Sequence, residues 1–181
     1  MTIPILQLSQ FEHYPPITQK LITKALGMAA LGLTYTYGSA NPKSGGMDCS
    51  GTINYLLLGM GVKNVPRDAN GLYEWTVAQG HFYPVKSNSF SSPEFNELRP
   101  GDLLFWSGTY VTKSNALVTH VMLYLGINLD GKPLMFGSSN GRTYEGIQRW
   151  GVSVFDFNLP SATSTSHFLG FSCIPTLTCG V

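Results

Sequence analysis

The stretch Ser44–Leu57, "SGGMDCSGTINYLL", places a cysteine between a flexible segment and an apolar helix pattern. Small residues precede Cys49. Apolar residues follow it at the i, i+3, i+4 and i+7 spacing of one helix face: Ile53, Leu56, Leu57 and Met60. Gly59 or Gly61 can end this helix. The pattern predicts a helix that begins at or just after Cys49.

Two interpretations of Cys49 follow from this stretch. The unpaired N–H groups and partial positive charge of a helix start stabilise a thiolate, and a nearby histidine can accept the thiol proton. A lone cysteine is, however, more often a small buried hydrophobe. Asp48, just before the helix, is expected to cap it or to hold the turn. The stretch alone leaves both interpretations open.

Helices are expected on both sides of this stretch. Pro15 and Pro16 suggest a helix start, and the helix is expected to end near Gly32. Its apolar face consists of Ile17, Leu21, Ala25, Met28 and Ala29. The segment 35–46, "YTYGSANPKSGG", is typical of a loop, residues 68–79 favour a further helix, and 82–97 is expected to be irregular.

The second half of the chain changes to a strand pattern. "RPGDLLFW" predicts a turn, with Asp102 as a turn residue, followed by a strand, and "HVMLYLGI" alternates between two faces. "NLDGK" favours a hairpin connection into "PLMFG", the glycines of "GSSNG" favour a turn, and "VSVFDF" and "FLGFSCI" favour two more strands. Helices followed by consecutive strands predict an α+β fold with an antiparallel sheet.

The composition limits the class of protein. A chain of 181 residues fits a single domain, 1–181, whose motif-bearing core spans about 17–158. With 43% hydrophobic and 12% charged residues the chain is not disordered, and a net charge of +1 gives no argument for nucleic acid. No apolar run approaches the ~20 residues that span a bilayer. The first residues, "MTIPILQLSQFEHYPP", do not have the pattern of a signal peptide.

The other two cysteines and the four histidines are the further candidates for catalytic or metal-binding residues. Cys173 and Cys179 either pair with each other or are two ordinary thiols. Of the four histidines, only His120 opens a strongly patterned strand, which can hold it still at a cleft. Cys49 and His120 supply two ligands where zinc usually takes three or four, and no CxxC or HExxH motif occurs. No metal and no cofactor is therefore expected.

Three segments in one order, "YTYGS…MDCSGTINYLL", "ELRPGDLLFW" and "THVMLYLG", resemble the NlpC/P60 family of bacterial cell-wall cysteine peptidases. The resemblance runs from about Tyr35 to Gly141. It implies a papain-like fold in which the helix that carries the nucleophile packs on an antiparallel sheet. The resemblance implies that Cys49 is the nucleophile and His120 the general base. It also implies substrate-binding roles for Tyr35, Ser50 and Arg67.

One position departs from the family pattern. The family usually has a polar residue, often histidine, on the next strand to orient the base, and Phe136 occupies that place in "LMFGSSNGR". A phenylalanine cannot accept a hydrogen bond from an imidazole. Ser138, which would share a face with Phe136, or Asn140 is expected to substitute. A backbone carbonyl or a water could serve instead, or the enzyme is weak or inactive.

The expected function is hydrolysis of peptide bonds in peptidoglycan stem peptides, at the γ-D-glutamyl-diamino acid bond, through a thioester on Cys49. One alternative is a non-catalytic or weakly active binder of these peptides, and another is an acyltransferase on a related papain-like fold. The expected partners are peptidoglycan stem peptides. The substrate implies a periplasmic or secreted protein, and wall maintenance and an interbacterial toxin role are not distinguished.

Overall fold

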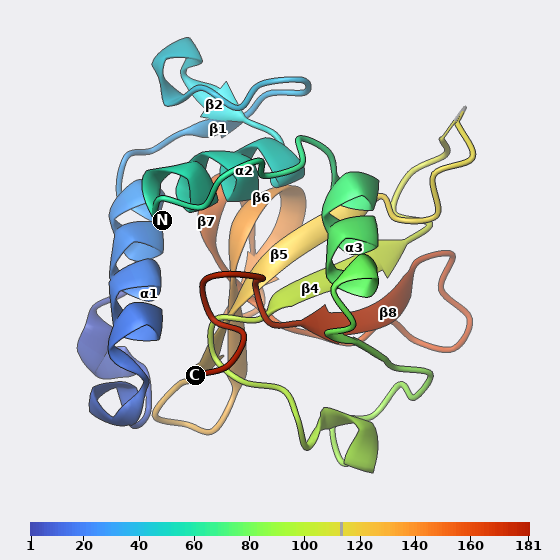
Figure 1. Cartoon of the computed structure of the whole chain (residues 1–181). Coiled ribbons are helices and arrows are strands. Elements are labelled where there is room, and N and C mark those ends of the chain that lie inside the picture. Colours follow the sequence, from blue (N-terminus) through green and yellow to red (C-terminus); the bar gives the residue numbers. More distant parts are fainter. Residues whose placement is uncertain (113) are drawn as a thin grey trace.

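The computed structural model of the chain describes residues 1–112 and 114–181 (Figure 1). Within these residues the helices lie where the sequence predicts them. They are α1 (Pro16–Ala29), α2 (Cys49–Gly59) and α3 (Ala69–Ala78). Cys49 is the first residue of α2, as the apolar spacing after it indicated.

The strands of the second half form one antiparallel sheet in the order β3-β8-β4-β5-β6-β7. Its strands are β3 (Phe82–Pro84), β4 (Leu103–Ser107), β5 (His120–Ile127), β6 (Pro133–Tyr144), β7 (Ile147–Asp156) and β8 (His167–Ser172). Two short strands, β1 (Thr34–Tyr35) and β2 (Gly46–Met47), pair in parallel just before α2. The expected α+β fold is confirmed.

The sheet has an apolar layer on each face. The helices lie on one face (Figure 1), where residues of α1 and α2 share a core cluster with Val121 and Leu123 of β5. On the other face a second cluster contains Trp106, Met122 and Tyr124. Successive residues of a strand point to opposite faces. The alternation along β5 therefore aims His120 toward the second cluster, away from the helices.

Two expectations about the loops are wrong. The glycines of "GSSNG" do not form a turn, because β6 continues to Tyr144 and pairs with β7 along this whole stretch. Gly141, with φ +88°, lies at a register shift between Asn140 and Arg142, so the strand bulges instead of ending. The segment 82–97 is not wholly irregular, since it contains β3 and a 3-10 turn at Pro93–Phe95.

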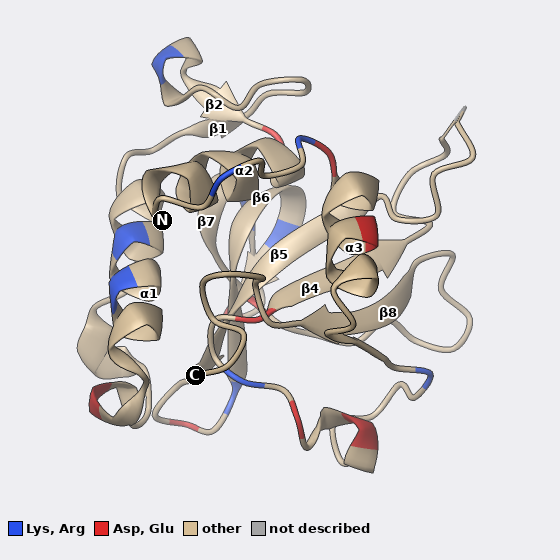
Figure 2. Ribbon diagram, viewed as in Figure 1, with Lys and Arg blue, Asp and Glu red and all other residues tan. Residues whose placement is uncertain are grey.

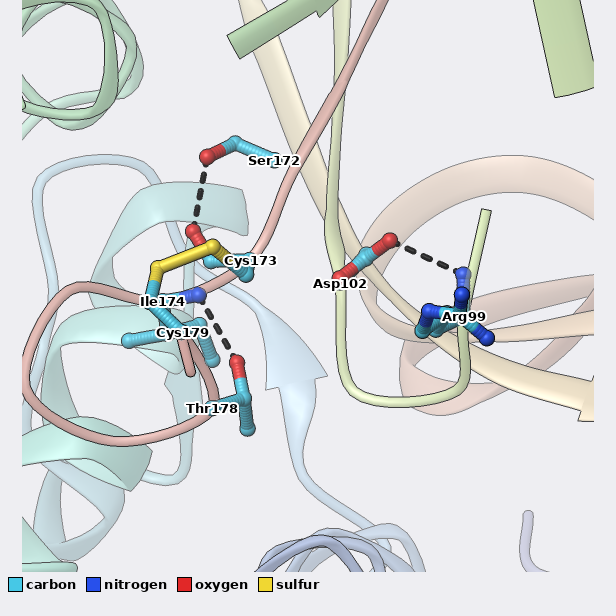
Figure 3. The surroundings of a disulfide bond; sticks show 7 residues. All are labelled: Arg99, Asp102, Ser172, Cys173, Ile174, Thr178 and Cys179. Carbon is cyan, nitrogen blue, oxygen red and sulfur yellow. Dashed lines mark hydrogen bonds between the residues drawn. A yellow bond between two sulfur atoms is a disulfide. The ribbon is translucent and has the colours of Figure 1, made fainter. Parts of the chain in front are cut away.

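A disulfide joins Cys173 and Cys179 in the C-terminal segment (Figure 3). The short loop between them is closed by the Ile174 N–H, which donates to Thr178 Oγ1 over 2.8 Å. Nearby, Asp102 Oδ2 accepts the Arg99 N–H over 2.9 Å, which confirms Asp102 as a turn residue. The disulfide leaves Cys49 as the free cysteine.

Charged residues are sparse and of mixed sign along the ribbon (Figure 2). Among the described residues we find no helix with the length and apolar character needed to cross a bilayer.

Candidate active site

The start of α2 is fixed by the carboxylate of Asp48. Asp48 Oδ1 accepts the Gly51 N–H over 2.7 Å, and its Oδ2 accepts the Gly38 N–H over 2.8 Å. This confirms Asp48 as the helix cap. Gly51 is required sterically, because a Cβ there would collide with the carbonyl oxygen of Ser39. The DCSG tetrapeptide therefore holds Cys49 at a rigid helix start.

Arg67 ties this start to the following loop. Its two terminal nitrogens reach the two carboxylate oxygens of Asp48 over 3.2 and 3.1 Å, and Nη1 also donates to Ser50 Oγ over 3.0 Å. A two-pronged pair of this kind fixes geometry as well as charge. The positive charge of Arg67 is thus matched by Asp48.

The thiol of Cys49 lies against the backbone at the start of β5. Its Sγ is 4.0 Å from the carbonyl oxygen of Thr119, the residue before His120. Burial raises the pKa of Cys49 to about 11, although hydrogen bonds from the backbone, that of Val121 foremost, act in the opposite direction. Cys49 is therefore a neutral thiol at neutral pH.

The imidazole of His120 lies beside Trp106, with 5.5 Å between the ring centroids. Its Nε2 is buried and has no hydrogen-bond partner among the described residues. Burial lowers the pKa of His120 well below its ordinary value, and the charge of Arg142 acts in the same direction. His120 is therefore a neutral base at neutral pH.

Two cavities flank the contact between Cys49 and β5. The first, which we call the cysteine-side cavity, has a volume of about 480 Å³, and its lining includes Tyr35, Asp48, Cys49, Ser50, Arg67 and Thr119. The second, the histidine-side cavity, has a volume of about 340 Å³, and its lining includes Thr109, His120, Ser139, Asn140, Arg142 and Ser166. The hydroxyls of Thr109 and Thr119 lie 2.6 Å apart and link the two walls.

The structure therefore gathers most of the predicted site residues in two groups. Tyr35, Cys49, Ser50 and Arg67 line the cysteine-side cavity, whereas His120 lines the other. Burial, and then the neighbouring Cys49, raise the pKa of the Tyr35 hydroxyl to about 12, so it remains a donor. Among the described residues there is no hydrogen bond between the thiol and the imidazole.

The expected orienting residue lies elsewhere. Ser138 is fully buried, and its hydroxyl donates to the carbonyl oxygen of Met47 over 2.6 Å, so it fastens β6 to β2. Phe136 pairs with Leu123 and packs in the helix-side cluster. Ser138 shares that face, whereas His120 lies beside Trp106 at the other face, with the two rings tilted by 55°. Ser138 consequently gives His120 no hydrogen bond in this structure.

Three residues near His120 are not among those predicted from the sequence: Arg142, Ser139 and Trp106. The guanidinium carbon of Arg142 lies 4.7 Å from the centroid of the Trp106 ring. Arg142 and Ser139 both line the cavity that His120 lines. The expected turn at "GSSNG" accounts for Ser139 and Arg142, because only a continued β6 brings these two residues to the cavity that His120 lines. Trp106 lies on the predicted strand β4, where its apolar surroundings gave no sign of a site.

One group of potential metal ligands lies outside the set of predicted catalytic residues. Among the described residues, three side chains with metal-binding atoms come together at His81, Cys173 and Cys179, with those atoms within 4.8 Å of one another. The two sulfurs are joined in the disulfide. This cluster does not include any of the predicted catalytic residues.

Comparison with protein families identifies the class of this fold and site. The NlpC/P60 family model matches residues 32–153, which include both Cys49 and His120. The chain belongs to the NlpC/P60 family, as its motifs indicated.

Two known proteins are similar to this chain. Murein DD-endopeptidase MepH of Escherichia coli (strain K12) is 30% identical over 99 residues, which are 55% of this chain and 30% of MepH. The chain thus matches less than a third of that relative's length. The crystal structure of a protein similar to lipoprotein, of the NLP/P60 family, from Staphylococcus aureus subsp. aureus Mu50 aligns with a TM-score of 0.56 at 23% identity. That alignment covers 89% of this chain and 42% of the other, and it supports the fold.

Proposed function

We propose that this chain is a cysteine hydrolase that cuts peptide bonds in peptidoglycan stem peptides. The observation that carries the proposal is the position of the Cys49 thiol, which a capped helix start holds against the backbone beside His120. Membership of the NlpC/P60 family and similarity to a murein endopeptidase support the substrate class.

The resting protonation states suit general-base catalysis. Burial keeps the thiol protonated and the imidazole neutral. In the proposed mechanism, His120 accepts the thiol proton as Sγ attacks the amide carbonyl, and backbone N–H groups at the start of α2 stabilise the oxyanion. The C–N bond then breaks, and His120 gives the proton to the leaving amine. Water, deprotonated by His120, hydrolyses the thioester and returns the thiol.

Two bonds are candidates for cleavage. The bond between γ-D-glutamate and a diamino acid is the one that the resemblance to the NlpC/P60 family implies. The name of the relative MepH, a DD-endopeptidase, favours a bond between two D-centres. Mass spectrometry of the fragments released from purified sacculi separates the two, because each cleavage leaves a different pair of new termini.

The decisive test is Cys49→Ala. We expect this variant to release no peptide fragments from purified sacculi, while the wild-type chain releases them. The matching His120→Gln variant is expected to lose activity as well, because an amide cannot accept the thiol proton. Unfolding curves of both variants show whether the fold is intact. Unchanged release by Cys49→Ala would refute the proposal.

A non-catalytic binder is the second candidate. The lack of a partner for His120 Nε2 and the raised pKa of Cys49 favour it. Calorimetric binding of stem peptides, combined with no release of fragments by the wild-type chain, would establish this alternative.

We also propose that the protein acts outside the cytoplasm. Its proposed substrate lies there, and the Cys173–Cys179 disulfide is of a kind that persists in oxidising compartments. Intact-mass measurement of protein from fractionated cells, with and without thiol reduction, tests both location and disulfide.

A further inference from the structure

Arg142 is a half-buried cation that has no anionic partner within the described part of the chain. It follows the bulge of β6 and lines the histidine-side cavity. Its guanidinium makes no salt bridge and no side-chain hydrogen bond with the described residues, and it lies over the Trp106 ring. The residue is only half-buried, and none of its nitrogens is among the buried polar atoms without a partner, so its five donors are open to water or to a ligand in the cavity.

The charge of Arg142 persists despite this burial. Burial lowers the pKa of Arg142 to about 10, and the nearby Cys49 raises it again. The side chain is therefore protonated at neutral pH. Because no acidic side chain of the described residues neutralises this charge, the guanidinium is available to pair with an anion that enters the cavity.

The surroundings of Arg142 suit an anion. The lining of the histidine-side cavity is polar, with hydroxyls at Thr109, Ser139 and Ser166 and an amide at Asn140. None of the described residues that line it is acidic. A cavity of about 340 Å³ has room for a carboxylate and the carbon atoms around it.

We propose that Arg142, in the histidine-side cavity, binds a free carboxylate that flanks the scissile amide of the substrate. This inference rests on the proposed function, and it adds a specificity residue to it. His120 lines the same cavity, so a carboxylate held there lies next to the base that serves the leaving amine.

The chemistry of both candidate bonds supplies such a carboxylate. A γ-linked glutamate uses its side-chain carboxyl in the amide, which leaves its α-carboxyl free on the same residue, separated from the amide carbonyl by the Cα, Cβ and Cγ carbons. A diamino acid acylated at one D-centre likewise retains the carboxyl of that centre. A planar guanidinium binds a carboxylate through two parallel hydrogen bonds. The Trp106 ring beneath it restricts the plane of the guanidinium before substrate arrives.

Two matched substrates test the proposal. One is a synthetic stem peptide with the flanking carboxylate free, and the other carries the same group as a primary amide. We expect the wild-type chain to cut the free acid roughly 10- to 100-fold more efficiently in kcat/KM, as one charged hydrogen-bonded pair allows. In Arg142→Met this preference should disappear, so that the ratio of kcat/KM for the two substrates is about 1. Arg142→Lys should keep a part of it, since it retains the charge but not the planar fork.

The controls separate this inference from the proposed function. Suppose that Cys49→Ala loses all cleavage while Arg142→Met keeps the full preference for the free acid. This result would overturn the carboxylate site and leave the proposed function intact. An equal fall for both substrates in a normally folded Arg142→Met would overturn it as well. If the wild-type chain cuts neither peptide, Kd values for both peptides on Cys49→Ala, with and without Arg142→Met, supply the same comparison. Equal Kd values, or no binding, would refute the carboxylate site.

Discussion

Arg67 and Arg142 flank the contact between the Cys49 thiol and β5, one in each cavity, yet their surroundings are opposite. Arg67 forms two hydrogen bonds to Asp48 and a third to Ser50, so its charge is matched within the chain. Arg142 rests on the Trp106 ring without a carboxylate from the described residues. Hydrogen bonds within the chain thus hold the cysteine side rigid, whereas the histidine side keeps a cation for the proposed carboxylate.

The largest effect that tests this comparison is expected at Asp48. Asp48→Ala removes the cap of α2, the acceptor of the Gly38 N–H and the partner of Arg67 at once. We expect it to lower the free energy of unfolding by roughly 2–4 kcal/mol, because a partly buried Arg67 and two N–H groups lose their partner. Urea unfolding measures the loss.

Asp68 supplies a matched control for that variant. It caps α3 in the same way, accepting the Gly71 N–H over 2.6 Å, but it is exposed and pairs with no cation among the described residues. Asp68→Ala should therefore cost only about 0.5–1 kcal/mol. Equal losses for the two variants would show that the Arg67 network adds nothing beyond an ordinary helix cap.

The second prediction concerns the Cys49 thiol. With its pKa raised to about 11, the thiolate fraction below that pH is smaller than in an ordinary thiol. Iodoacetamide should therefore alkylate Cys49 in the folded, ligand-free chain roughly 100-fold more slowly at pH 8 than in the urea-unfolded chain. The rate should rise with pH until about 11.

The unfolded chain with its disulfide intact is the control, since Cys49 is then the single free thiol in both states. A rate that reaches its plateau below pH 8 would contradict the prediction. It would mean that the resting thiol and His120 already form an ion pair.

Much of the cysteine side could be predicted from sequence because its signals are local. The helix after Cys49 follows from apolar spacing, and the cap follows from a single aspartate before it. The strand that His120 opens follows from strict alternation. These features depend on residues that are near each other in the chain.

The histidine side could not be predicted because it depends on a long-range register. The bulge at Gly141 keeps β6 paired with β7 and brings Arg142 to the cavity. From sequence, glycines in "GSSNG" favour a turn equally well. Which face Ser138 occupies also depends on pairing between strands, since a shift of one residue moves every side chain to the other face.

The smallest predicted effect is the difference that the two arginines make to folding. Arg67→Met removes a partner from the nearly buried Asp48 and should lower the free energy of unfolding by about 1–2 kcal/mol, because the side chain of Arg67 is 41% exposed and solvent screens part of the pair. Arg142→Met removes a charge that no described carboxylate matches, so we expect a change within about 0.5 kcal/mol. Urea unfolding of both variants, without ligand, gives the difference. A larger loss for Arg142→Met would show that the histidine-side arginine supports the fold instead of awaiting a ligand.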